Sequence, residues 1–282
     1  MKKIGQFFFT FLPFLLALGL QFLVMFFMMG ISGLTEFASS SHANSEGFVQ
    51  SIDRLTELWS ALPFNTCIMI FFSLSCTVVF GLWYYMRYDG NYLPRLKSTF
   101  HPLTFLGILM LVPGLQYLST YIVSFVSMLF PSWLDAYMKL MESAGMDAPL
   151  TVEMFLYSVL LAPVSEELIF RGVTMRQAKK YFSFWAANLF QAILFGIFHM
   201  NMIQGIYAFC LGLFLGYTCE KGKSIYHSIL FHMLFNFWGT VLSGCFTIEE
   251  TTFSILFWFF FAISMSFGGL AVFRAGAKRL PA

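Results

Sequence analysis

Long apolar blocks constrain this chain more than any other feature of its sequence. Of its 282 residues, 59% are hydrophobic and 11% are charged, whereas soluble domains carry about 25% charged residues. A helix needs about 20 apolar residues to cross the hydrocarbon core of a bilayer. Blocks near or above that length predict helices at residues 7–34, 62–86, 102–130, 151–180, 182–200, 204–219, 224–245 and 252–274. We therefore predict an all-α, polytopic membrane protein with about eight transmembrane helices, forming a single domain over residues 1–282.

The breaks between these blocks alternate in charge along the chain. Thirteen basic residues fall in the breaks on one side, and only Arg54 and Lys139 fall in those on the other. The positive-inside rule places the basic breaks in the cytoplasm. The longest breaks, residues 35–61 and 131–150, lie on the opposite side and carry no predicted helix. We predict a multi-pass protein of the cell membrane with both termini in the cytoplasm.

Two classes of site are disfavoured by composition. The five cysteines are scattered, mostly inside apolar blocks, and no two form a C-x-x-C pair. This spacing argues against a thiolate zinc site and against a disulfide framework. A net charge of +2 gives no indication of a nucleic-acid partner, and none is predicted.

The stretch LLAPVSEELIFRGV, residues 160–173, places three charged side chains inside an apolar block. A charge at the bilayer centre costs at least about 2.5–3.5 kcal/mol. Glu167 and Arg171 are four residues apart, so they are predicted to pair on one helix face. Glu166 is rotated about 100° from Glu167, which leaves it free to face the interior. Pro163 has no amide hydrogen, so it is expected to loosen the turn before Glu166.

Two later blocks carry further polar side chains. At a rise of 1.5 Å per residue, His199 at the end of block 182–200 falls at a depth similar to that of Glu166. His232 and Asn236 share one face of block 224–245 because they are four residues apart. Phe195 shares a face with His199 for the same reason. The sequence thus predicts one polar site built from three helices inside the bilayer.

Two chemistries fit such a set, and the sequence leaves both open. A buried carboxylate and an imidazole can deprotonate a water molecule, while a second imidazole and an amide stabilise an oxyanion. Alternatively, Glu166, His199 and His232 form a His₂Glu ligand set for a divalent metal such as zinc. Both routes end in water attacking an amide carbonyl. No serine or cysteine has an evident place in the set, which disfavours a covalent mechanism.

Three motifs in order carry a family resemblance. They are E-E-x-x-x-R at residues 166–171, F-x-x-x-H at residues 195–199 and H-x-x-x-N at residues 232–236. With these motifs the chain resembles the CPBP family, which contains the Rce1-type CAAX prenyl proteases and the bacterial Abi proteins of bacteriocin processing and immunity. The core of the resemblance covers residues 151–240.

The resemblance implies an intramembrane endopeptidase with a conical cavity open towards the cytoplasm. It assigns water activation to Glu166 and His199, and oxyanion stabilisation to His232 and Asn236. Glu167, Arg171 and Phe195 would support these groups. A metal is disputed in the family, so zinc and a metal-free mechanism remain equal expectations. The expected substrate is a leader peptide or another peptide or protein in or at the lipid bilayer.

Two alternatives stay open. A non-catalytic bacteriocin immunity or scaffold protein would keep the same fold and motifs. A proton-coupled transporter would use the carboxylates as a relay, but it would be expected to show inverted repeats, and no such symmetry is visible in the sequence. One smaller pattern concerns packing: Ala208, Gly212 and Gly216 form a stripe of small residues that predicts close helix approach.

Overall fold

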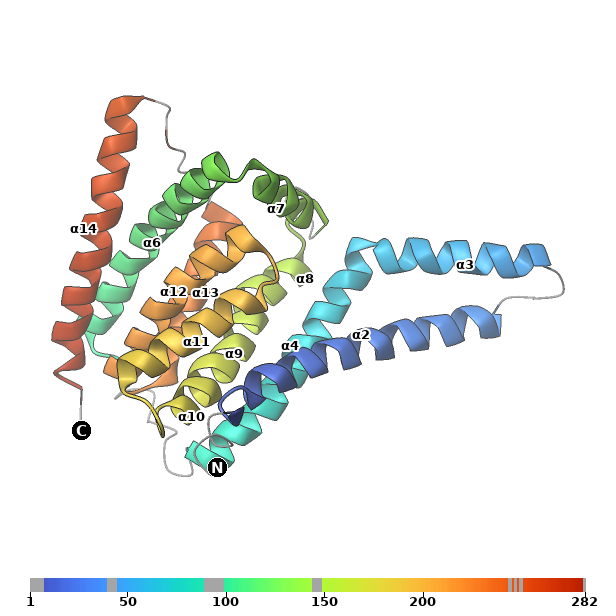
Figure 1. The fold of residues 1–282 in the computed structure, drawn as a ribbon, viewed down its shortest axis with the longest axis horizontal. Helices are drawn as coiled ribbons and strands as arrows, with labels where there is room; N and C mark the ends of the chain where they lie inside the picture. The colour runs from blue at the N-terminus through green and yellow to red at the C-terminus, as the bar shows by residue number, and fades with distance from the viewer. Residues whose placement is uncertain are drawn as a thin grey trace.

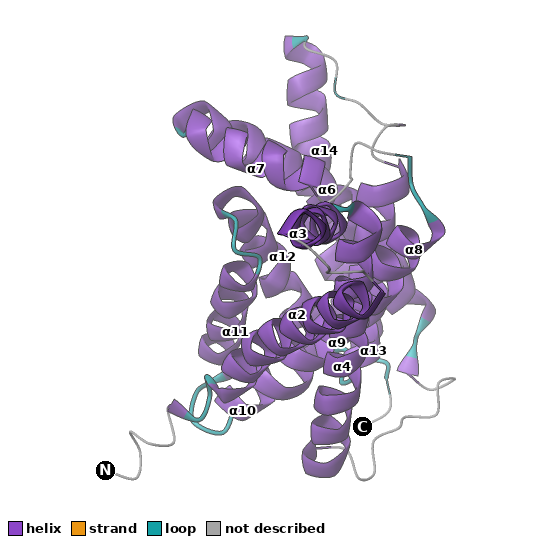
Figure 2. Cartoon of the chain, turned by 90° about the vertical axis from the view of Figure 1, so that its right-hand side faces the viewer, coloured by secondary structure: helices purple, strands orange, loops and turns teal. Residues whose placement is uncertain are grey.

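The computed structural model describes residues 8–39, 45–88, 99–143, 149–242, 245, 248 and 251–280. Within these residues the regular structure is helical and contains no β-strand (Figure 2). The predicted all-α fold is therefore confirmed.

In the part of the chain that the structure describes, each predicted apolar block forms a helix or a helix with short irregular turns. Five helices in the described chain are long and apolar enough to cross a membrane. They are α2 (Leu12–Ser39), α4 (Leu62–Tyr88), α6 (Pro102–Leu129), α12 (Met202–Lys221) and α14 (Thr252–Ala277). The chain is thus a multi-pass membrane protein, as predicted. The apolar helices α11 (Phe184–Phe198) and α13 (Ile225–Phe237) are shorter, and η3 (Trp238–Leu242) continues α13 as a wide π-helical turn.

The block predicted at residues 151–180 is one helical path made of segments with different turns. It consists of α8 (Val152–Phe155), η1 (Leu156–Leu161), α9 (Ala162–Glu167), η2 (Leu168–Met175) and α10 (Arg176–Ala178). The segments η1 and η2 are π-helical, with backbone hydrogen bonds spanning five residues instead of four. Backbone angles at the junctions remain right-handed helical, so the path is not broken.

Two helices lie in the breaks that the sequence analysis left without helices. These are α3 (Ser45–Ser60) and α7 (Pro131–Ser143). Both mix polar and apolar residues, so they fall below the hydrophobicity of a membrane-spanning block. Leu55 of α3 is buried, and the Trp59 indole nitrogen donates to Ser32 Oγ on α2. A search restricted to apolar blocks overlooks such amphipathic helices.

Side-chain caps fix where most of the core helices begin. A cap residue accepts a hydrogen bond from an unpaired backbone N–H in the first helical turn. The caps are His101 for α6, Thr151 for α8, Ser183 for α11, Asn201 for α12, Ser224 for α13 and Thr251 for α14. The predicted starts of these helices agree with the observed ones to within two residues.

Helices α6 and α14 lie side by side along most of their length (Figure 1). Two glycines seven residues apart on each helix make the contact close: Gly107 and Gly114 on α6, and Gly269 and Gly276 on α14. A Cβ on Gly107 would lie 2.6 Å from the Phe273 backbone nitrogen. Small residues at such positions let membrane helices approach closely, which increases their van der Waals contact.

The stripe on α12 also packs as predicted. A Cβ on Gly212 would lie 3.2 Å from the Ala192 Cα of α11, and Ala208 is buried. The partner face is therefore α11, whose Gly196 approaches Gly205 of α12 in the same way.

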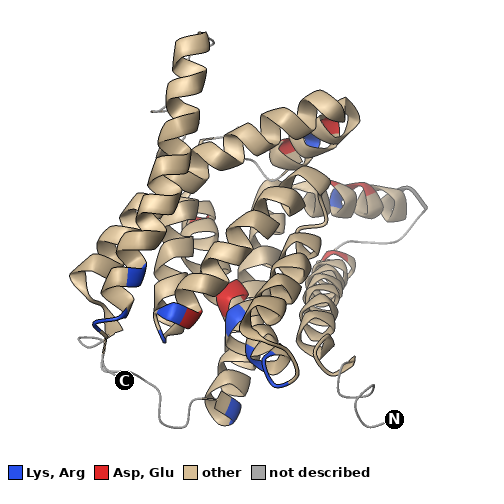
Figure 3. Cartoon of the chain, turned by 60° about the vertical axis from the view of Figure 1, so that its left-hand side comes forward, with Lys and Arg blue, Asp and Glu red and all other residues tan. Residues whose placement is uncertain are grey.

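The charged residues are distributed unevenly between the two ends of the bundle. Lysines and arginines gather at the end where α14 terminates, while acidic residues lie at the opposite end on α3 and α7 (Figure 3). The described basic residues at the first end, called the basic end below, are Arg87, Arg176, Lys179, Lys180, Lys221, Lys223, Arg274, Lys278 and Arg279. Helix α2 also begins at this end (Figure 1).

The glycine contact between α6 and α14 predicts a large effect of a small substitution. Gly107→Ala should lower the free energy of unfolding by about 1–3 kcal/mol, because the new methyl group meets backbone atoms that cannot move aside. Thermal unfolding in detergent measures the effect. The control is Gly30→Ala on α2, where nothing lies within 4 Å and helix propensity favours alanine by up to about 1 kcal/mol. Equal stability of both variants would contradict the close contact.

Candidate active site

The wide turn before Pro163 leaves one backbone carbonyl in need of a donor. In an α-helical turn the Ser158 carbonyl would accept from Ala162, but the Ala162 N–H donates to the Tyr157 carbonyl instead. In a π-helical turn the donor would be residue 163, and proline has no N–H. The Asn236 side chain supplies the hydrogen bond, with Nδ2 2.9 Å from the Ser158 oxygen. Pro163 thus loosens the turn, as predicted, and the loosened turn fixes the position of Asn236.

Glu167 and Arg171 form the predicted pair, and both side chains are fully buried. Arg171 Nη1 donates to Glu167 Oε1 at 2.7 Å. Arg171 Nη2 also donates to the Gly212 carbonyl of α12, and the guanidinium lies 4.4 Å from the centre of the Phe195 ring. A buried guanidinium with this many contacts compensates the carboxylate and ties three helices together.

The same carboxylate orients His232. His232 Nδ1 lies 3.0 Å from Glu167 Oε1, and because a carboxylate oxygen accepts, the ring nitrogen carries the hydrogen. The opposite nitrogen, Nε2, then points towards Glu166, with 3.7 Å to its Oε2. The two carboxylates therefore lie on opposite sides of the His232 ring, Glu167 at Nδ1 and Glu166 at Nε2.

His199 is oriented by the backbone of Phe195. It follows the last residue of α11, and its Nδ1 donates to the Phe195 carbonyl at 2.9 Å. A neutral His199 consequently has its lone pair on Nε2. The Phe195 ring also meets both imidazoles edge to face, with ring centres 4.8 Å from His199 and 5.8 Å from His232.

One cavity brings the four predicted catalytic side chains together. It has a volume of about 500 Å³, and Glu166, His199, His232 and Asn236 all line it. The predicted convergence of three helices on one polar site therefore holds in the structure. Phe195 is also part of the wall, whereas Glu167 and Arg171 lie behind it.

The cavity is also lined by several polar groups that no sequence motif marks. Tyr137 of α7 and Tyr207 of α12 share a side-chain hydrogen bond. Burial raises the pKa of Tyr137, so its hydroxyl stays neutral at physiological pH. Gln116 of α6 reaches the Phe235 carbonyl of α13. In a chain with 38 phenylalanines and 12 tyrosines, no local pattern marks these residues.

The cavity lies in the half of the bundle away from the basic end. His199 follows the end of α11, Asn236 lies near the end of α13, and Tyr137 and Met141 come from α7. Figure 1 places α7 at the end of the bundle opposite the one where α14 terminates. The two orientation expectations therefore disagree: the positive-inside rule puts the basic end in the cytoplasm, while the family resemblance puts the cavity opening there.

The side chains do not fit a metal site as they are placed. In each histidine Nδ1 is hydrogen-bonded, so Nε2 is the nitrogen left for a ligand. Metal-binding histidines commonly have this arrangement, with the second ring nitrogen donating to a protein oxygen. In the described part of the chain, however, no three His, Cys, Asp or Glu side chains are grouped closely enough to hold a metal ion. The zinc ligand set Glu166, His199 and His232 stays a prediction.

Comparison with known proteins agrees with the motifs. Residues 148–238 match the family model for the type II CAAX prenyl endopeptidases, Rce1-like. The matched segment contains all three motifs. The resemblance to the CPBP family is thereby confirmed. No curated protein and no solved structure matches the chain.

Replacing the arginine of the buried pair should affect stability much more than replacing the lysine of a partly exposed pair. Arg171→Ala should cost about 3–5 kcal/mol of stability, because Glu167 would keep a buried charge without its main partner. Lys179→Ala, which removes the partly exposed pair with Glu220, should cost about 0–1 kcal/mol. Yield of folded protein and thermal unfolding in detergent distinguish the two. A normal melting temperature for Arg171→Ala would show that the pair is dispensable.

Proposed function

We propose that this chain, whose residues 148–238 belong to the Rce1-like family, is an intramembrane endopeptidase that hydrolyses a peptide bond with an activated water molecule. One observation carries the proposal: Glu166, His199, His232 and Asn236 line a single cavity inside a membrane protein. An acid, two imidazoles and an amide at one cavity are the groups that amide hydrolysis needs.

Water activation falls to Glu166 and His199. Glu166 is the carboxylate that faces the cavity without the Arg171 contact, so its oxygen is available to accept a proton. The Nε2 lone pair of His199 accepts a hydrogen bond from the same water molecule. The water attacks the carbonyl carbon, and its proton passes to Glu166. The carboxylic acid then returns that proton to the leaving amine as the C–N bond breaks.

Oxyanion stabilisation falls to His232 and Asn236. Glu167 accepts from His232 Nδ1 and so holds the ring with Nε2 towards the cavity, where a hydrogen on this nitrogen donates to the developing oxyanion. Asn236 uses one amide hydrogen on the Ser158 carbonyl, which leaves the second for the cavity. Both donors are held before the substrate arrives, so little reorganisation is needed in the transition state.

The proposed substrate is a leader peptide or a membrane-associated protein that enters from the α7 end. With both termini in the cytoplasm, as the basic end indicates, the cavity opens at the outer face of the membrane. Tyr137 and Met141 of α7 then meet the substrate first, because they line the cavity from outside the core helices.

Removal of either water-activating group should abolish hydrolysis while the fold survives. Glu166→Gln and His199→Ala are each expected to lower kcat by about 10²–10⁴-fold, measured with fluorogenic peptides on protein reconstituted in liposomes. Glu153→Gln, an exposed residue on the same helical path, is the control. Full activity in both cavity variants would remove these two residues from the mechanism, whereas no hydrolysis by the unaltered protein would favour the non-catalytic immunity or scaffold interpretation. Metal analysis of the same active preparation decides whether a metal accompanies the activity.

A double replacement separates the structural role of Asn236 from its catalytic role. Asn236→Leu removes the donor to the Ser158 carbonyl and should cost about 1–3 kcal/mol of stability. Adding Pro163→Ala supplies a backbone N–H at the position that faces this carbonyl, so stability should recover. Activity should stay low in the double variant because the oxyanion donor is still missing. If activity returns together with stability, Asn236 acts only through the fold.

Labelling of introduced, exposed cysteines tests the face on which the cavity opens. In a background with the exposed Cys67 and Cys245 changed to serine, Glu142→Cys on α7 should react with a membrane-impermeant maleimide in intact cells. Arg279→Cys at the basic end should react only after the cells are permeabilised. The reverse pattern would place the cavity opening in the cytoplasm.

A further inference from the structure

A second hollow lies on the outside of the bundle, between α11, α12 and α14. It has a volume of about 440 Å³, which is within the range of ligand sites. Its residues are distinct from those of the active-site cavity. Helix α14 is held mainly by α6 and touches α12 only sparsely, so the hollow is a groove where α12 and α14 diverge.

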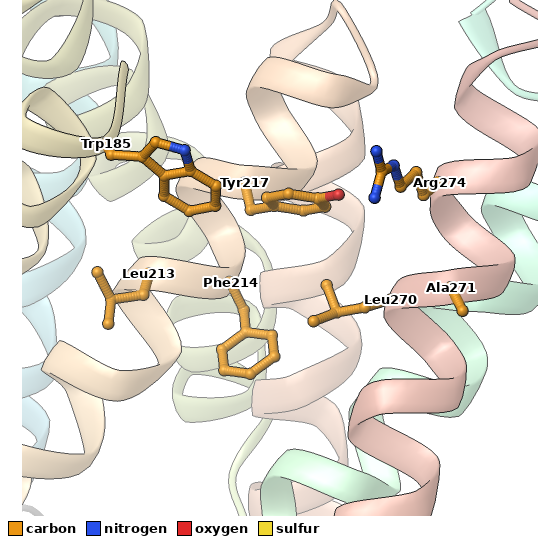
Figure 4. Close-up of a pocket in the computed structure, with 7 residues that line it drawn as sticks. All are labelled: Trp185, Leu213, Phe214, Tyr217, Leu270, Ala271 and Arg274. Atoms are coloured by element: carbon orange, nitrogen blue, oxygen red, sulfur yellow. The ribbon is translucent and has the colours of Figure 1, made fainter. Parts of the chain in front are cut away.

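The groove has a polar rim and an apolar floor. Figure 4 shows Trp185, Tyr217 and Arg274 at one level, with Leu213, Phe214 and Leu270 at the other. The rings of Trp185 and Tyr217 stack with centres 6.1 Å apart. Among the described residues, the exposed Arg274 side chain makes no hydrogen bond or salt bridge.

The rim lies where a membrane–water interface is expected. Trp185 is the second residue of α11, Tyr217 precedes Lys221 by one turn, and Arg274 lies in the last turn of α14. All three positions are at the basic end of the bundle. Tryptophan and tyrosine at the ends of membrane helices lie at the level of the lipid headgroups, and the apolar floor is then at the depth of the acyl chains.

We propose that this groove binds an anionic diacyl phospholipid. The guanidinium of Arg274 holds the phosphate, for which its planar set of donors is suited. The Tyr217 hydroxyl donates to the same headgroup, and one acyl chain lies along Leu213, Phe214 and Leu270.

Charge complementarity selects this occupant over a second helix. An apolar helix seated in the groove would cover Arg274 and leave a desolvated cation without a partner, which is costly. A phosphate supplies the missing negative charge, and the surrounding basic residues add to the attraction for anionic lipid. Because the groove lies between helices on the outside of the bundle, a lipid reaches it by lateral diffusion.

The test is native mass spectrometry of the full chain in detergent, titrated with palmitoyl-oleoyl phosphatidylglycerol or phosphatidylcholine. Phosphatidylglycerol should bind preferentially to the intact protein. Arg274→Gln should weaken it about fivefold, the effect of about one cationic side chain at a lipid surface. Ala271→Trp, which fills the groove and keeps the arginine, should weaken it as well. The control is Arg87→Gln, another exposed arginine, in the last turn of α4, which should leave binding unchanged.

Two outcomes would overturn the proposal. Equal binding of the two lipids, or equal losses in Arg274→Gln and Arg87→Gln, would show only a general attraction to charge. A dimer that Ala271→Trp converts to a monomer would assign the groove to a second copy of the chain. Thermal unfolding of each variant confirms that the compared proteins are folded.

Discussion

The buried ion pair between Glu167 and Arg171 is the interaction on which the site depends. Arg171 bonds the α12 backbone at Gly212 and covers the ring of Phe195 on α11, while Glu167 holds the ring of His232 on α13. A single pair therefore connects four helical elements inside the bilayer. A buried pair contributes little net stability compared with apolar packing, so its value here lies in the geometry it imposes on the two imidazoles.

Sequence reasoning succeeded where local spacing decides geometry. Four-residue spacing predicts the Glu167–Arg171 pair and the shared face of His232 and Asn236, because both follow from helical periodicity alone. Apolar block length predicts the helices that carry them. Membrane proteins suit such reasoning, since backbone groups in lipid must be satisfied within the helix and few alternatives to a helix remain.

The same reasoning missed what depends on tertiary contacts. Pro163 signals a loosened turn, but that Asn236 satisfies the Ser158 carbonyl is visible only once α13 is placed beside η1. Tyr137 was missed because its helix, α7, is too polar to stand out as a membrane-spanning block, although this helix lines the cavity. Similarly, the glycines of α6 and α14 are far apart in the sequence, and only their seven-residue spacing hints that they share a contact.

The π-helical turn η1 has a consequence for the register of the whole path that follows it. Each residue in an α-helix advances the side chains by about 100°, so a wide turn that accommodates an extra residue sets the angular position of everything after Leu161. Removing the extra residue from η1 would convert it into an ordinary α-helical turn and move each residue before the turn into the position of its successor, with no change in composition at the motif. The motif and the irregular turn before it therefore form one structural unit, in which the number of residues matters as well as their charges.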